Sequence, residues 1–135
     1  MATTGIMNGT DLKIKLTGSS IAYLTSNGES YTNSLRETTN KDSGGNAEYA
    51  YGKFGGTWDA ELLHVEGGTN GFSFLFGAMT GRTVLAAEVT TGVTGDKKYT
   101  CSVLVGDVKR TEPMEDNTTV TCTLTITGAV TEATV

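Results

Sequence analysis

The strongest constraint on the fold is a regular alternation of threonine with apolar residues near the C-terminus. Threonine occupies every odd position from 119 to 127, and the even positions carry Val120, Cys122, Leu124 and Ile126. Because successive side chains of a strand point to opposite faces, this pattern predicts a strand with one buried face and one hydroxyl-rich face. Residues 99–105 alternate in the same way, and the two segments together predict a long closing hairpin.

The composition also favours a mostly-β fold. Glycine is abundant, with 18 among 135 residues, there is a single proline, and charged residues make up only 19%. Threonine, valine and tyrosine fit half-buried pleated strands, whereas long helical bundles need more alanine, leucine, glutamate and lysine. The length predicts one domain, residues 1–135, and we expect flexible ends at residues 1–8 and 130–135.

Shorter patterns predict the other strands. Alternating or apolar runs indicate strands at 12–16, 21–25, 57–65 and 83–91, and a polar strand with little core contact over 29–39. Asn27-Gly28 is the strongest hairpin-turn signal in the chain.

One short α-helix is predicted around residues 70–80. The apolar run 71–80 ends at Gly81, and Phe72, Leu75, Phe76 and Met79 fall on one helical face. A buried strand from Phe72 to Phe76 is the alternative, because short apolar runs fit both structures. The residues expected in the core are Trp58, Phe72, Leu75, Phe76, Met79, Cys101, Cys122 and Leu124. The two cysteines are expected to be buried, inert thiols, and the pattern leaves open whether they face each other.

A long irregular loop is predicted around residues 40–56. Its first part, Asn40 to Asn46, consists almost entirely of turn-forming residues, and Tyr49, Tyr51 and Phe54 follow before Gly55-Gly56. A loop of this length in a small domain is more often functional than idle. Exposed aromatic side chains on such a loop are typical of a protein interface.

The sequence predicts no catalytic, metal or cofactor site. His64 is the only histidine, and the carboxylate pairs Asp59/Glu61 and Glu115/Asp116 have the spacing of an ordinary solvent face. Three cysteine and histidine residues are too few for zinc. The oxygen-bearing residues of 40–48 lack the ligand spacing of a calcium loop, and Gly45 with Gly52-Lys53-Phe54 departs from a phosphate-binding loop.

The charge excludes one class of partner. The net charge is −5, and no basic cluster exceeds the pairs Lys97-Lys98 and Lys109-Arg110, so nucleic-acid binding through phosphates is not expected. Residues 1–4 carry no secretion-signal pattern, and no apolar run reaches membrane-spanning length. We therefore expect a cytoplasmic product that does not insert into membranes. Because small sheets must pair or protect their edges, a structural or binding module that self-associates is the leading hypothesis.

One part of the sequence is similar to a known family. The segment Glu37-Thr38-Thr39-Asn40-Lys41-Asp42-Ser43-Gly44-Gly45, followed by Gly52 and Thr57-Trp58, resembles the major tail proteins of phages. These are the TP901-1-type tail tube proteins of long, non-contractile tails. The resemblance includes the opening segment Gly9–Gly18, the helix and the closing hairpin, and it covers roughly residues 7–130.

The resemblance implies a β-sandwich or barrel-like subunit with one flanking helix. Subunits would form hexameric rings that stack into the tail tube of a virion, assembled in the host bacterial cytoplasm. Double-stranded DNA would pass through the lumen without specific binding, and the threonine face of 119–127 is a candidate lining. Tape measure and tail completion proteins would be further partners. The interface residues implied are Asn40, Lys41, Asp42, Ser43, Gly44 and Gly45. The aromatic residues of the same loop, Tyr49, Tyr51 and Phe54, are expected to belong to the same interface.

Two alternatives remain at this stage. One is the tube of a contractile tail, an injection device or a gene-transfer particle. The other is an extracellular or surface β-sandwich binding module, an adhesin or a carbohydrate-binding protein, which would present Tyr49, Tyr51 and Trp58 as ligand platforms.

Overall fold

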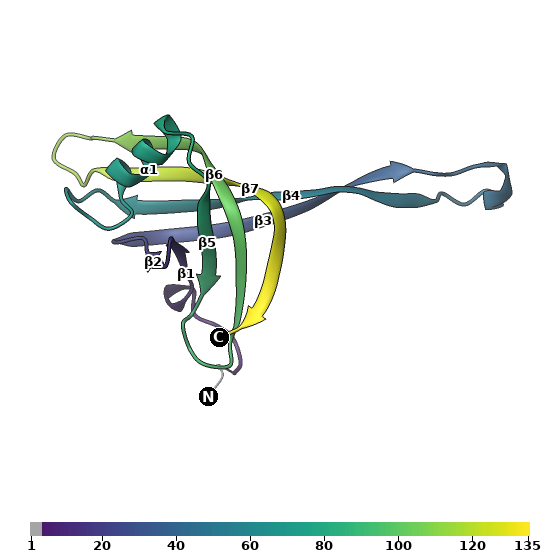
Figure 1. Cartoon of the computed structure of the whole chain (residues 1–135), viewed down its shortest axis with the longest axis horizontal. Helices are drawn as coiled ribbons and strands as arrows, with labels where there is room; N and C mark the ends of the chain where they lie inside the picture. The colour runs from purple at the N-terminus through teal and green to yellow at the C-terminus, as the bar shows by residue number, and fades with distance from the viewer. Residues whose placement is uncertain (1–3) are drawn as a thin grey trace.

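The computed structural model describes residues 4–135 and confirms a mostly-β chain with one short α-helix (Figure 1). The strands are β1 (Lys13–Leu16), β2 (Ser19–Ser20), β3 (Leu24–Glu37), β4 (Tyr49–Leu63), β5 (Leu85–Thr90), β6 (Lys97–Thr111) and β7 (Thr119–Thr134). The α-helix is α1 (Phe72–Thr80), and two short 3-10 turns are η1 (Gly9–Asp11) and η2 (Lys41–Ser43). No helix in the part described is long and apolar enough to cross a membrane.

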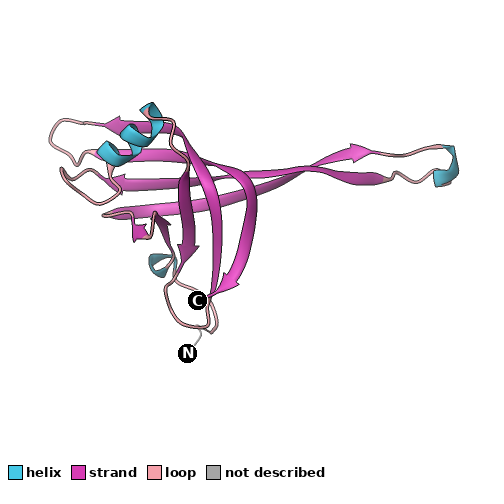
Figure 2. Ribbon diagram, viewed as in Figure 1, coloured by secondary structure: helices cyan, strands magenta, loops and turns pink. Residues whose placement is uncertain are grey.

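All strands join one antiparallel seven-stranded sheet in the order β2-β1-β5-β6-β7-β4-β3. The sheet curls because two of its long strands, β6 and β7, bend across its middle (Figure 2). Their pairing shifts register between Thr100 and Ser102 and again between Val105 and Asp107. Such bulges bend a strand and increase its twist. The bend divides the sheet into a half containing β1, β2 and β5 and a half in which β3 and β4 lie beside β7 and the end of β6.

The core lies inside the curl. Apolar side chains of one phase on β1, β4, β5, β6 and β7 are buried there, including Ile14, Trp58, Leu62, Val103 and Leu124. Helix α1 packs against β6 and closes the core with Leu75 and Ala78. Asn70, just before the helix, donates to the carbonyl oxygens of Leu16 (3.0 Å) and Ser19 (2.7 Å), which fixes the β1–β2 turn to the helix entry.

The prediction of which helix side chains are buried is wrong in part. Leu75 is fully buried, Phe72 and Met79 are half-buried, and Phe76 has 49% of its surface exposed. The helix is rotated so that the small residue Ala78 faces the core in place of Phe76. Of the other residues expected in the core, Trp58, Cys101, Cys122 and Leu124 are all buried.

The most prominent feature is a two-stranded hairpin that leaves the body and projects to one side (Figure 1). We call residues 31–56 the arm. The sequence placed an irregular loop at 40–56, but residues 49–56 belong to β4 and pair with β3 from Tyr31 to Glu37. The irregular part is confined to residues 38–48, which we call the tip. The turn expected at Asn27-Gly28 is also wrong, because both residues lie inside β3 and pair with Ala60 and Asp59.

The two ends of the chain differ. Residues 130–135 were expected to be frayed, but β7 continues to Thr134, and Lys97 and Tyr99 of β6 pair with Thr134 and Glu132. The backbone of Val135 also exchanges hydrogen bonds with Gly95 and Asp96. Residues 4–8 form no regular element, and the rest of the N-terminal segment expected to be flexible lies outside the described residues.

Candidate functional site: an arm and two open sheet edges

The tip of the arm has a defined structure that its sequence explains. Asn40 caps η2 by accepting a hydrogen bond from the Asp42 amide (2.9 Å), and the Ser43 hydroxyl accepts one from the Asn40 amide (3.0 Å). This reciprocal pair is a capping box. Gly44 and Gly45 then have positive φ values of 66° and 85°, which glycine adopts without strain. The motif Asn-Lys-Asp-Ser-Gly-Gly therefore encodes a defined, capped turn at the far end of the arm.

One face of the arm is aromatic and largely exposed. Cross-strand neighbours share a face, and the pairs Tyr31/Gly56, Asn33/Phe54, Leu35/Tyr51 and Glu37/Tyr49 continue the face on which Trp58 lies. The exposed fractions reach 77% for Tyr51, 60% for Leu35 and 59% for Tyr49. An isolated two-stranded hairpin is only marginally stable in water. A large apolar face on such a hairpin indicates burial against another molecule.

The arm is anchored where it meets the body. The buried Trp58 indole donates a hydrogen bond to the Tyr31 hydroxyl (3.1 Å), and the Tyr31 ring stacks on Phe54 at 6.2 Å. Glycine at position 56 allows β4 to approach the Ser30 carbonyl oxygen too closely for any side chain. The arm is therefore a continuation of the sheet with a defined direction.

The half of the sheet that carries the arm has two open edges. On one side, β3 is the last strand of the sheet along its whole length. On the other side, β5 pairs with β6 only between Tyr99 and Val103. Among residues 4–135, no strand pairs with that side of β6 from Leu104 to Thr111. Unpaired backbone donors and acceptors on such edges are templates for pairing with another chain.

The outward face of this half-sheet is polar and acidic. Cross-strand rows place Asp59 beside Thr123 and Asp107, and Glu61 beside Thr121 and Lys109. Together with residues 26–28 of β3, they line a shallow depression of about 320 Å³. Three carboxylates against one ammonium group give this face a negative field that repels phosphate groups.

The two free cysteines are buried, and neither offers a reactive thiolate. Cys122 lies opposite Ala60 and Val108, and Cys101 lies opposite Ala87, so the two cysteines are not neighbours across the hairpin. Burial raises the pKa of each thiol to about 11, which leaves almost no reactive thiolate at neutral pH. His64 Nε2 lies 3.0 Å from a Glu66 carboxylate oxygen. The described residues contain no cluster of three metal-ligating side chains.

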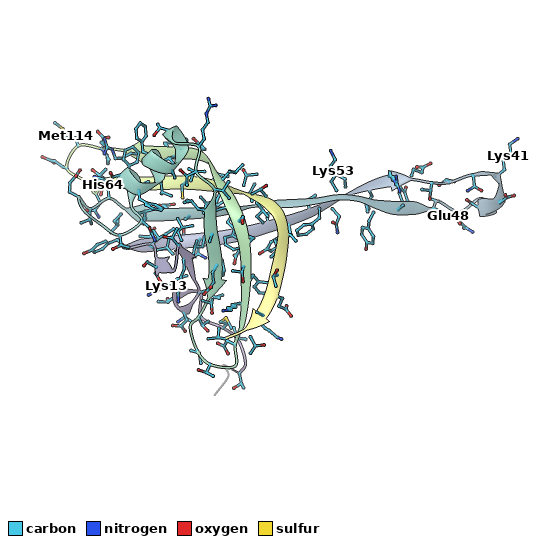
Figure 3. The ribbon with its side chains drawn as sticks, viewed as in Figure 1. Lys13, Lys41, Glu48, Lys53, His64 and Met114 are labelled. Carbon is cyan, nitrogen blue, oxygen red and sulfur yellow. The ribbon has the colours of Figure 1, made fainter. Side chains whose placement is uncertain are left out.

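The structure brings together the interface residues expected from the sequence. Asn40, Lys41, Asp42, Ser43, Gly44 and Gly45 lie in the tip, and Tyr49, Tyr51 and Phe54 lie along the aromatic face (Figure 3 labels Lys41, Glu48 and Lys53). Sequence reasoning missed Tyr31 and Leu35 as members of this face. Their spacing on the polar strand was visible, but only the pairing with β4 places them beside Phe54 and Tyr51.

The comparisons with known proteins address the fold. The sequence matches no protein-family model and no curated protein. A chain in the virion of a native gene transfer agent particle superposes with a TM-score of 0.81 at 16% identity, covering 95% of this chain and 99% of that chain. The tail of an empty gene transfer agent particle, with C6 symmetry, gives 0.80 at the same identity and coverage. The SPP1 tail tube gives 0.77 at 12% identity, covering 96% of this chain and 80% of that one.

This is the tail tube fold. The fold similarity spans nearly the whole chain, so the tail tube fold includes the body as well as the long hairpin. The arm and the open edges are therefore features of a chain whose architecture matches subunits of tubular particles.

Proposed function

We propose that the chain is the structural subunit of a virion tail tube, in which six copies form each ring and rings stack into a hollow conduit. The observation that carries this proposal is the four-stranded half-sheet with two open edges. Its strands β6, β7, β4 and β3 alternate in direction. Because the number is even, β3 of one copy lies antiparallel to β6 of the next when copies are related by rotation about the tube axis. Pairing around a ring then leaves no open edge.

The polar face of the half-sheet fits the lumen. Inside such a ring, the core and helix α1 lie on the outer side of the sheet, and the threonines of β7 with Asp59, Glu61 and Asp107 face inward. A lumen lined by hydroxyls and carboxylates attracts no phosphate, so double-stranded DNA can slide through it without specific binding. Tape measure and tail completion proteins are the further partners of such a tube, and the function is structural rather than catalytic.

The arm supplies the contacts between copies. It extends roughly 30 Å from the body at about 3.4 Å per residue, which is enough to reach across a neighbouring subunit. The tip residues 40–45 and the aromatic side chains of Tyr49, Tyr51 and Phe54 are the interface we propose. The C6 symmetry of the gene transfer agent tail supports the proposed ring number.

Negative-stain electron microscopy of the purified protein, at low and high concentration, tests this function. The expected result is rings or hollow tubes, with six-fold symmetry in averaged end-on views. Small monodisperse particles at every concentration, including in the presence of preformed tube ends as initiators, would exclude a self-assembling tube. A glycan array would then test the surface-binding alternative directly.

A further inference from the structure

A cleft beside helix α1 has no role in the contacts proposed so far. It lies at the end of the body where β4 ends and is lined by the loop 64–71, the start of α1 and Arg110 of β6, with a volume of about 280 Å³. Figure 3 shows His64 at this end of the molecule and Lys41 at the far tip of the arm, at the opposite end.

The cleft is built around stacked aromatic rings. Phe72 and Phe76 stack with centroids 5.9 Å apart, and the His64 ring meets Phe72 edge-on at 6.1 Å. The guanidinium carbon of Arg110 lies 4.4 Å from the Phe72 ring centre. Phe76 exposes about half of its surface at the rim of the cleft, so a further aromatic ring can pack there without displacing a side chain.

The charges in the cleft select against an anionic ligand. His64 Nε2 lies 3.0 Å from Glu66, and Arg110 Nε donates to Glu112 at 2.7 Å. The Arg110 guanidinium and the His64 imidazole therefore already have carboxylate partners on the same chain. What remains for a ligand is the aromatic surface and the open side of the guanidinium, which fit a neutral aromatic side chain.

The arm presents neutral aromatic side chains at the end of the molecule opposite to the cleft. Tyr49 and Tyr51 are strongly exposed, and they lie near the tip on the aromatic face of the arm. Because β3 and β4 run through the body into the arm, a second copy displaced along the arm direction brings its cleft to the tip of the first (Figure 1). Two different surfaces at opposite ends make a head-to-tail contact that repeats without limit.

We propose that the cleft lined by His64, Phe72, Phe76 and Arg110 receives the aromatic face of the arm from a second copy in the next ring. This inference rests on the proposed function and names the surface that accepts the arm. It gives the tube a polarity, because every ring presents arms at one end and clefts at the other. Ring closure through β3 and β6 is a separate contact and does not require it.

Selective disulfide cross-linking tests the contact. One preparation carries Tyr51→Cys and another carries Phe76→Cys, and the two are mixed, assembled and oxidised. The native cysteines are buried and do not compete. We expect cross-linked dimers at least about tenfold more abundant in this mixture than in either preparation alone, because proximity raises the effective concentration of the two thiols. Ser73→Cys, also in the cleft, repeats the test without removing an aromatic ring.

A matched control separates this contact from random collision. Val93→Cys places an exposed thiol in the connection between β5 and β6, away from the cleft, and is expected to give no enrichment with Tyr51→Cys. Tubes seen by electron microscopy without selective cross-links at either Phe76 or Ser73 would overturn this inference and leave the proposed function standing. Absence of both tubes and cross-links would overturn both.

Discussion

Gly56 and Gly55 are adjacent residues at the base of the arm with opposite surroundings. A Cβ at Gly56 would clash with the Ser30 carbonyl oxygen on β3, whereas a Cβ at Gly55 meets nothing within 4 Å. We expect Gly56→Ala to lower the free energy of unfolding by about 2 kcal/mol, because overpacking forces the two strands apart. Urea denaturation followed by circular dichroism measures this change.

Gly55→Ala is the matched control at the residue scale. It changes the same residue type in the same strand, and we expect it to alter the free energy of unfolding by no more than about 0.5 kcal/mol. Equal losses in the two variants would show that the effect comes from replacing a strand glycine in general. The close approach of β3 and β4 would then not be the reason for glycine at position 56.

At the scale of the element, the arm is separable from the body. None of the apolar side chains in residues 33–54 belongs to the buried core of the body. Replacing residues 33–54 with the turn Asn-Gly joins Thr32 to Gly55, which are paired neighbours on β3 and β4. We expect this shortened chain to fold and to form no tubes, because the surface proposed to join one ring to the next is gone.

Two measurements decide this prediction about the arm. Circular dichroism and a cooperative urea transition establish that the body is folded, and electron microscopy scores assembly. Tubes of normal appearance from the shortened chain would contradict an arm-mediated contact. Loss of the cooperative transition would show that residues 33–54 are part of the folding unit, although none of their apolar side chains belongs to the core.

Elements with strong local patterns could be predicted from the sequence. The threonine alternation at 119–127 identified β7, and the apolar run 71–80 identified α1 within a residue. The position of the arm in the sequence was predicted, but residues 49–56 were predicted as part of an irregular loop. Tyr49 to Gly56 has a strand partner only once β3 folds beside it. Asn27-Gly28 was misleading for the same reason, since pairing with β4 outweighs a local turn preference.

The parts of the site that depend on topology could not be predicted. Nothing local marks Leu104–Thr111 as an open edge, because openness depends on where β5 stops pairing with β6. The cleft likewise joins His64 of one loop to Arg110 of a distant strand. Phe76 fitted the helical apolar stripe, but the helix orientation that buries Ala78 is fixed by packing against β6.

At the scale of the whole molecule, the distribution of charge distinguishes a lumen from an outer surface. The net charge is −5, and Asp59 and Glu61 lie on the polar face proposed to line the tube. Glu115 and Asp116 form a second exposed acidic pair, in the turn between β6 and β7. Reversing both charges of either pair changes the net charge by four units, from −5 to −1. Two variants with equal total charge can therefore be compared.

We expect tubes carrying Asp59→Lys and Glu61→Lys to retain short duplex DNA in a nuclease-resistant form, because their lumen now attracts phosphates and shields bound DNA. Tubes carrying Glu115→Lys and Asp116→Lys should bind only DNA that nuclease removes, and unaltered tubes should retain none. Retention should fall steeply with added salt, since binding releases condensed counterions. Equal protected fractions in the two variants would mean that the face bearing Asp59 and Glu61 does not line the conduit. The proposal that the polar face of the half-sheet faces the lumen would then be wrong.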